Sequence, residues 1–167
     1  MDESMEKMRA QAAVEMLSYG IFFLLVFVIA TAVFLHLQAQ EISRAENAYA
    51  QQLAYQLADQ INIAFVAGPG FWHTVRVPPD LLGKQYRLIV SRAYGQQAQY
   101  ETGFVYVDWN GGKSSVSAPT VTSAFSIGAS GPGIGYSGQF VEINSTVSCL
   151  NISNIAGNIT FRRASAC

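Results

Sequence analysis

The sequence predicts an α+β fold, in which a long N-terminal α-helix, hydrophobic and then amphipathic, precedes a β-rich head domain built as an antiparallel sheet or sandwich. Three observations lead to this prediction. Residues 16–35 contain no charged side chain, and residues 38–67 contain neither proline nor glycine, as expected of helices. Residues 71–167, which we call the head domain, alternate short apolar and polar stretches with turn residues, as expected of strands.

The first helical segment, residues 11–37, is predicted to be a transmembrane or filament-core helix. Its uncharged stretch, residues 16–35, extends about 30 Å as a helix, which matches the hydrocarbon core of a bilayer. The run is longer than the apolar region of a secretory signal peptide, and no small-residue cleavage site follows it. We therefore expect this segment to stay on the mature protein, with any processing in the leader, residues 1–10.

An amphipathic extension of the helix is predicted for residues 38–67, which are rich in Ala, Gln, Leu and Glu. Large apolar residues recur in it at spacings of four and seven, which indicates an apolar stripe along one side. Gly68-Pro69-Gly70 then ends the helix. We expect the stripe to pack against the head domain through Ile42, Tyr49, Leu53, Leu57, Ile61 and Phe65.

Short strands joined by turns are predicted throughout the head domain. The dipeptide Asn110-Gly111 is a strong hairpin signal, because both residue types tolerate the backbone of a tight turn. Residues 128–138 hold five glycines and are predicted to form a loop. The strands are expected within residues 74–77, 81–91, 104–109, 114–117, 120–127, 139–148 and 158–163.

Composition and motifs argue against two classes of function. The net charge is −1 and the longest basic run is Arg162-Arg163, so a nucleic-acid partner has no electrostatic support. No GxSxG, HExxH, P-loop or GxGxxG motif is present. The sequence therefore predicts a protein that is not an enzyme and has no catalytic, cofactor-binding or metal site. Acidic residues after Phe71 are few: Asp80, Glu101, Asp108 and Glu142.

Cys149 and Cys167 are the two cysteines of the chain. Neither has a CxxC spacing or a nearby histidine, which argues against a metal site. In an external compartment we expect them to form a disulfide, which would stabilise the fold by about 3 kcal/mol on a loop-entropy treatment. Two free thiols are the alternative.

Three acceptor motifs for N-glycosylation follow one another in the C-terminal part of the head domain. Each has the pattern N-x-[ST] without proline in the middle, and such motifs are used on the surfaces of exported proteins. The alternative is a chance result of Ser/Thr-rich strands. The motifs begin at Asn144, Asn151 and Asn158.

Glu15 is the unusual residue beside the apolar segment, because a carboxylate next to a membrane helix is costly without a partner. Cleavage between Ala10 and Gln11 would place Glu15 at the fifth position of the mature chain. Arg9, Ala10, Gln11 and Glu15, followed by an intact hydrophobic helix, form a pattern that resembles the archaeal type IV pilin-like proteins with class III, prepilin-type signal peptides.

This resemblance implies a structural subunit of a type IV pilus-like surface filament that serves adhesion. A prepilin peptidase would remove residues 1–10, and the subunit would wait in the membrane before the assembly ATPase and platform protein move it into a filament of its own copies. Glu15 would pair with the new N-terminal amine. The head domain would face outward as an extracellular glycoprotein.

Two alternatives remain open on the sequence. One is an uncleaved single-pass membrane protein with an extracellular binding domain, in which Glu15 lies at the interface near Lys7 or Arg9. The other is a minor pilin or an accessory component of the pilus machine, which starts or braces a filament without forming its bulk.

Overall fold

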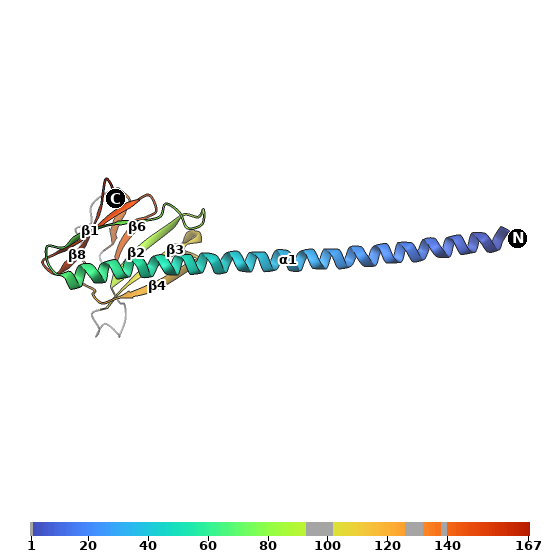
Figure 1. The fold of residues 1–167 in the computed structure, drawn as a ribbon, viewed down its shortest axis with the longest axis horizontal. Helices are drawn as coiled ribbons and strands as arrows, with labels where there is room; N and C mark the ends of the chain where they lie inside the picture. Colours follow the sequence, from blue (N-terminus) through green and yellow to red (C-terminus); the bar gives the residue numbers. More distant parts are fainter. Residues whose placement is uncertain (1, 93–101, 126–131, 138–139) are drawn as a thin grey trace. The chain divides into compact units, whose positions relative to one another are not determined.

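The computed structural model describes residues 2–92, 102–125, 132–137 and 140–167 (Figure 1). The chain divides into two compact units, Met1–Arg44 and Ala45–Cys167. Within the described residues the fold consists of one long α-helix, a short 3-10 helix and eight strands in two antiparallel sheets. The predicted α+β class, with an N-terminal apolar helix ahead of antiparallel sheets, is therefore confirmed.

Helix α1 covers Asp2–Ala67 and includes the leader as well as both predicted helical segments. Its end agrees with the sequence prediction. Gly68 and Gly70 both have positive φ, 84° and 92°, a region that glycine enters without the steric cost of a Cβ. Pro69 between them cannot continue the helical hydrogen bonding. The chain thus leaves the helix within three residues and enters the first strand.

The apolar stripe of α1 was only partly predicted. Ile42 and Phe65 are 59% and 38% exposed, so they do not belong to the core, and Tyr49 is half-buried. A spacing of four residues turns about 400° around a helix with 3.6 residues per turn, so a series of such steps drifts off any one face. The buried face instead combines spacings of three and of four residues and includes small residues: Ala50, Leu53, Ala54, Leu57, Ala58, Ile61 and Ala64.

The strands form a three-stranded sheet with the order β1-β7-β8 and a five-stranded sheet with the order β4-β3-β2-β6-β5. All pairings between these strands are antiparallel. The bounds are β1 Trp72–Arg76, β2 Tyr86–Arg92, β3 Gly103–Trp109, η1 Asn110–Gly112, β4 Ser114–Thr120, β5 Ile134–Ser137, β6 Phe140–Asn144, β7 Cys149–Ile155 and β8 Asn158–Arg163.

Most predicted strands are present, and the hairpin at Asn110-Gly111 joins β3 to β4, with Trp109 opposite Ser114. Two strands were missed. Strand β7 reads as polar and turn-like, yet it is the central strand of its sheet, bonded to β1 and β8. Strand β5 lies inside the predicted glycine-rich loop and is an edge strand paired with β6. Strand β7 pairs with its neighbour in sequence, β8, and also with β1, which is distant in sequence and is not reported by the local pattern. Strand β5 is a short edge strand that contains Gly135, a residue type that is unfavourable in strands.

The strand predicted for residues 120–127 is wrong over the described part. Thr120 ends β4, and the next four residues form no strand. Phe125 makes one parallel bridge to Ile159, and residues 126 and 127 lie outside the described range. The hydroxyl groups explain the break, because Thr120 Oγ1 donates to the Thr122 carbonyl and Thr122 Oγ1 accepts from the Ala124 amide. These local bonds replace ladder bonds.

The core of the second unit lies between residues 45–67 of α1 and the inner faces of the two sheets. Strand β3 shows the arrangement, because Val105, Val107 and Trp109 are buried while the residues between them face outward. Polar contacts fix the helix to the sheets: Asn154 Nδ2 donates to the Ala64 carbonyl over 3.1 Å, and the Val121 amide donates to Asn62 Oδ1 over 2.9 Å. Each of these two hydrogen bonds gives a partner to a polar group that is buried or lies at the edge of a sheet.

A nearly buried ion pair also joins α1 to the segment before β2. Lys84 Nζ lies 2.5 Å from Glu46 Oε1, and the Glu46 side chain is 6% exposed while the Lys84 side chain is 41% exposed. A carboxylate with so little contact with water needs a cation beside it. Neither residue stood out in the sequence, because Glu46 interrupts the apolar spacing that indicated the stripe.

Replacing Lys84 with methionine is expected to lower the free energy of unfolding by roughly 2 kcal/mol, because the buried Glu46 carboxyl group would lose its partner. Arg44→Met is the matched control, since the Arg44–Glu41 pair has the same type of contact at 2.8 Å but both side chains are more than 70% exposed. That variant should lose less than about 0.5 kcal/mol. Urea unfolding of the detergent-solubilised chain measures both, and equal losses would contradict the argument.

Candidate functional site

The first candidate site is the apolar surface of α1 between residues 11 and 37. Every side chain in this range is exposed within its unit, and the helix is long and apolar enough to cross a membrane. Because an apolar surface of this size is unfavourable in water, it requires lipid or protein around it. Its largest exposed side chains include Leu17, Tyr19, Phe22, Phe23, Leu24, Phe27, Ile29, Phe34 and Leu35.

The hydroxyl groups of Ser18 and Thr31, inside this surface, are satisfied by the helix itself. The hydroxyls of Ser18 and Thr31 donate to the carbonyls of Val14 and Phe27, each over 2.8 Å. Such bonds remove the need for water, so both residues tolerate an apolar environment. Gly20 leaves open space where another residue would carry a side chain, which permits close approach of a neighbouring backbone.

Glu15 stands at the start of this surface. The Gln11 side-chain amide donates from Nε2 to Glu15 Oε1 over 3.3 Å, since the two residues are one helical turn apart. An amide is neutral, so this long bond does not compensate the negative charge of the carboxylate. Ala10 and Gln11, which flank the predicted processing bond, lie on the continuous backbone of α1.

The head domain carries the predicted modification sites at different places on its sheets. Asn144 is the exposed last residue of β6, and Asn158 is the exposed first residue of β8, after the Ala156–Gly157 turn. Asn151 is half-buried in the middle of β7, and its Oδ1 is buried without a hydrogen-bond partner. Exposure at a strand end leaves the Asn144 and Asn158 amides open to modification, whereas Asn151 is more enclosed.

Cys149 and Cys167 form a disulfide, with their Cα atoms 5.4 Å apart. The Ala164 amide also donates to the Cys149 carbonyl over 2.9 Å. The residues after β8 are therefore tied to β7 by a covalent bond and a backbone hydrogen bond. A disulfide of this kind is typical of proteins in an oxidising compartment.

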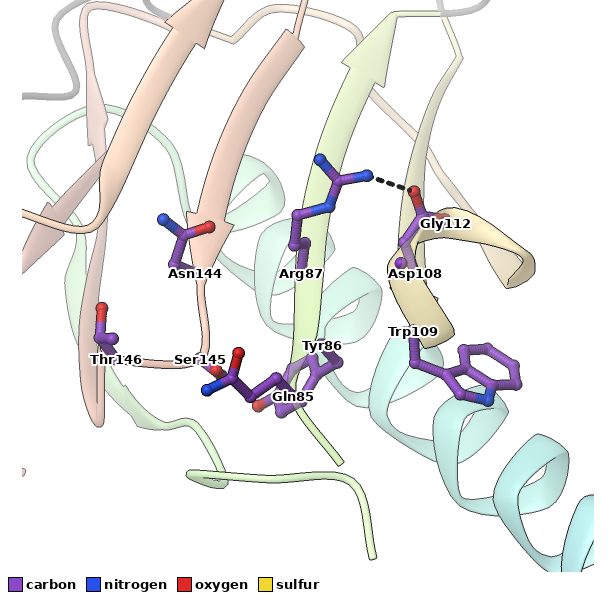
Figure 2. Close-up of a pocket in the computed structure, with 10 residues that line it drawn as sticks. Gln85, Tyr86, Arg87, Asp108, Trp109, Gly112, Asn144, Ser145 and Thr146 are labelled. Carbon is purple, nitrogen blue, oxygen red and sulfur yellow. Dashed lines mark hydrogen bonds and ion pairs between the residues drawn. The ribbon is translucent and has the colours of Figure 1, made fainter. Parts of the chain in front are cut away.

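A second candidate site is a hollow of about 380 Å³ on the outer face of the five-stranded sheet (Figure 2). Strand register places Asn144, Arg87 and Asp108 side by side on β6, β2 and β3, so their side chains leave the same face of the sheet. Figure 2 shows α1 behind the sheet, on the opposite side from these residues. The rest of the lining is Gln85, Tyr86, Trp109, Gly111, Gly112, Ser145 and Thr146.

Charged and polar groups meet in this hollow. Arg87 Nη2 lies 3.4 Å from Asp108 Oδ2, and Arg87 Nη1 lies 3.4 Å from Glu142 Oε1. Both distances exceed those of strong charge-assisted hydrogen bonds, and Arg87 is exposed, so the guanidinium can bind a further acceptor. The hollow therefore offers N–H donors and carboxylate acceptors beside each other.

Tyr86 also lines the hollow and is buried in the core. Burial raises the pKa of its hydroxyl well above the usual range, and the nearby Tyr49 and Asp80 add to the rise. The phenol therefore stays protonated and donates to the Pro78 carbonyl. This hydrogen bond ties the end of the Tyr86 side chain to the segment before β2.

Among the residues that the structure describes, no three His, Cys, Asp or Glu side chains come together as a metal site requires. The hollow was not anticipated from the sequence. Alternation in β2 and β3 would have placed Arg87 and Asp108 on the outer faces of their strands, but the sequence did not give the register between β2, β3 and β6. Comparison with protein-family models, curated proteins and solved structures finds no match to this chain.

Proposed function

We propose that this chain is a structural subunit of an archaeal type IV pilus-like surface filament, made as a precursor that a prepilin peptidase cuts between Ala10 and Gln11. The observation that carries the proposal is a helix with an unbroken apolar surface from residue 16 to residue 35 and one carboxylate, Glu15, at its start. A disulfide-bonded head domain follows the same helix.

The apolar surface suits two successive environments. In the membrane, lipid would surround residues 11–37 before assembly. In the filament, the same side chains would pack against the helices of neighbouring copies, and Gly20 would permit close approach. A helix that faced a single partner would need one apolar stripe only, whereas this segment is apolar on all sides.

Glu15 acquires a partner when the leader is removed. Cleavage before Gln11 creates a positively charged amine at the first residue of the helix, four positions from the carboxylate. Either this amine or that of a neighbouring copy would compensate Glu15 inside an apolar bundle, where a lone charge is costly. An acidic residue near a helix N-terminus is also favoured by the helix dipole.

The head domain would then form the outer surface of the filament, where it serves adhesion. The disulfide between Cys149 and Cys167 suits an external location, and exposed Asn144 and Asn158 are available for glycosylation. Its partners would be copies of itself, the prepilin peptidase, and the ATPase and platform protein that drive assembly.

N-terminal sequencing and intact mass of the native protein test the proposal, with Gln11 expected as the first residue. Ala10→Phe should reduce trimming by roughly a factor of ten or more, because a large side chain at the cut loses on the order of 1.4 kcal/mol or more of transition-state binding. Ala32→Phe is the matched control, because it makes the same change away from the cut and should be trimmed normally. Wild-type protein that begins at Met1 would overturn the proposal and support an uncleaved membrane anchor.

Abundance distinguishes a bulk subunit from a minor one. If the chain forms the body of the filament, it should be the main protein in filaments sheared from cells. A trace amount in a filament made of another protein would instead identify it as a minor pilin or accessory component.

A further inference from the structure

The hollow on the five-stranded sheet and the first glycosylation motif share the same residues. Asn144, Ser145 and Thr146 all line the hollow, so the entire acceptor motif forms part of its wall (Figure 2). Asn144 is exposed, while Arg87 lies directly opposite it on β2. Residues directly opposite on antiparallel strands have Cβ atoms about 5 Å apart. Anything attached to Asn144 therefore begins beside Arg87.

We propose that the hollow holds the innermost sugar of a glycan attached to Asn144, with Arg87 and Asp108 bonding to its hydroxyl groups. The inference rests on the proposed external location of the head domain. Attachment would replace one N–H bond of Asn144 Nδ2 by a bond to the anomeric carbon of a lipid-linked sugar diphosphate. The lipid diphosphate leaves, and the proton passes to a base of the transferase.

The chemistry of the hollow fits a sugar. A sugar hydroxyl both donates and accepts hydrogen bonds, so it needs a donor and an acceptor close together. The Arg87 guanidinium has five N–H donors and makes two long ion pairs of 3.4 Å, so it has donors for a further acceptor. Asp108 supplies carboxylate oxygens as acceptors. Gln85 at the rim supplies both kinds of group. Figure 2 shows Arg87 and Asp108 on adjacent strands with the ion pair drawn between them.

The size and the walls agree with this occupant. The volume of about 380 Å³ lies at the small end of the range for ligand pockets, roughly 300–1,000 Å³. Gly111 and Gly112 form one wall, and a Cβ on Gly112 would lie 3.6 Å from Arg87 Nη2. The absence of side chains there keeps the space beside the guanidinium open.

Attachment explains why an open hollow with a partly polar lining would be filled. A free sugar would bind weakly to a site exposed to water, because both partners are well solvated. A covalent link at the rim makes the contact intramolecular, with an effective concentration on the order of millimolar for a short flexible link. We therefore assign the hollow to the protein's own glycan and not to an external saccharide.

Asn158 provides an internal comparison, because it lies at the Ala156–Gly157 turn of the other sheet. The test uses full-length protein from its native filament or membrane fraction, treated with mild periodate, which oxidises vicinal diols of accessible sugars. Glycopeptide mass spectrometry then gives the oxidation rate at each asparagine. We expect the innermost sugar at Asn144 to react at least about five-fold more slowly than that at Asn158 in folded protein. In urea the two rates should be equal.

Variants identify the groups that hold the sugar. Arg87→Met should raise the rate at Asn144 to that at Asn158, and Asp108→Asn should raise it in part, with Asn158 unchanged in both. Arg76→Met, at an exposed position of β1, is the matched control and should change neither rate. If Arg87→Met does not fold, Arg87→Lys is the second variant, because it keeps the positive charge. It should still accelerate oxidation of the sugar at Asn144, because lysine lacks the planar set of N–H donors.

Three results would overturn the inference: no sugar on Asn144, equal rates at the two asparagines in folded protein, or rates insensitive to Arg87 and Asp108. The intact mass of the same sample separates this failure from failure of the proposed function. A chain that begins at Gln11 without a protected sugar would support the proposed filament subunit and contradict the proposed sugar site. A chain that begins at Met1 with a protected sugar would support the sugar site and contradict the filament subunit.

Discussion

Replacing Glu15 with alanine is expected to reduce the yield of assembled filaments by roughly ten-fold or more, while the precursor is still trimmed and the head domain stays folded. The variant leaves the new N-terminal amine without a carboxylate inside the helix bundle. An uncompensated charge in such a place costs roughly 3–5 kcal/mol, and each 1.4 kcal/mol changes an association constant about ten-fold. Because every subunit contributes the same contact, the loss recurs along the filament.

Two further variants separate charge from other effects. Glu15→Gln keeps the shape and the hydrogen bond to Gln11 but removes the charge, so it should lose assembly nearly as fully as alanine. Glu41→Gln removes a carboxylate from the same helix outside the apolar segment, where it pairs with Arg44, and should assemble normally. Shearing filaments from cells and quantifying the subunit by immunoblot measures all three. Normal assembly of Glu15→Gln would show that the charge is not needed.

Sequence pattern predicted the helix well because its signals are local. The absence of proline and glycine over residues 38–67 and the Gly68-Pro69-Gly70 stop depend on the backbone preferences of neighbouring residues. The same reasoning placed β8 at Asn158–Arg163, where a turn and an alternating stretch coincide. It was only partly right for the buried side of α1. Leu53, Leu57 and Ile61 belong to the core as predicted, but the alanines between them are not revealed by the spacing of large residues.

The candidate sites divide in the same way. The residues Ala10, Gln11 and Glu15 lie within one short stretch of the chain, so the sequence alone could indicate the motif. The hollow needed the structure, since Arg87, Asp108 and Asn144 come from three strands whose register is set by tertiary packing. Cys149 and Cys167 are an intermediate case. Their residue types indicated a bridge, but only the packing of the C-terminus along β7 brings their Cα atoms to 5.4 Å.

Phe161→Ala is expected to lower the free energy of unfolding of the second unit by roughly 3–5 kcal/mol, which is a large part of the stability of a small domain. Phe161 on β8 has no exposed surface, and its ring centroid lies 6.3 Å from that of Phe125. Alanine would leave a cavity that the flanking strands cannot close, because β8 is bonded to β7 and bridged to Phe125.

Phe161→Leu is the matched control, since it keeps most of the apolar volume and should lose roughly half as much stability or less. Urea unfolding in detergent, followed by the fluorescence of buried Trp109, measures both variants. Trimming at Gln11 should be unchanged, because Met1–Arg44 and Ala45–Cys167 are separate compact units and the cut lies in the first. If Phe161→Ala also blocked trimming, the peptidase would require a folded head domain, and processing would then depend on both units.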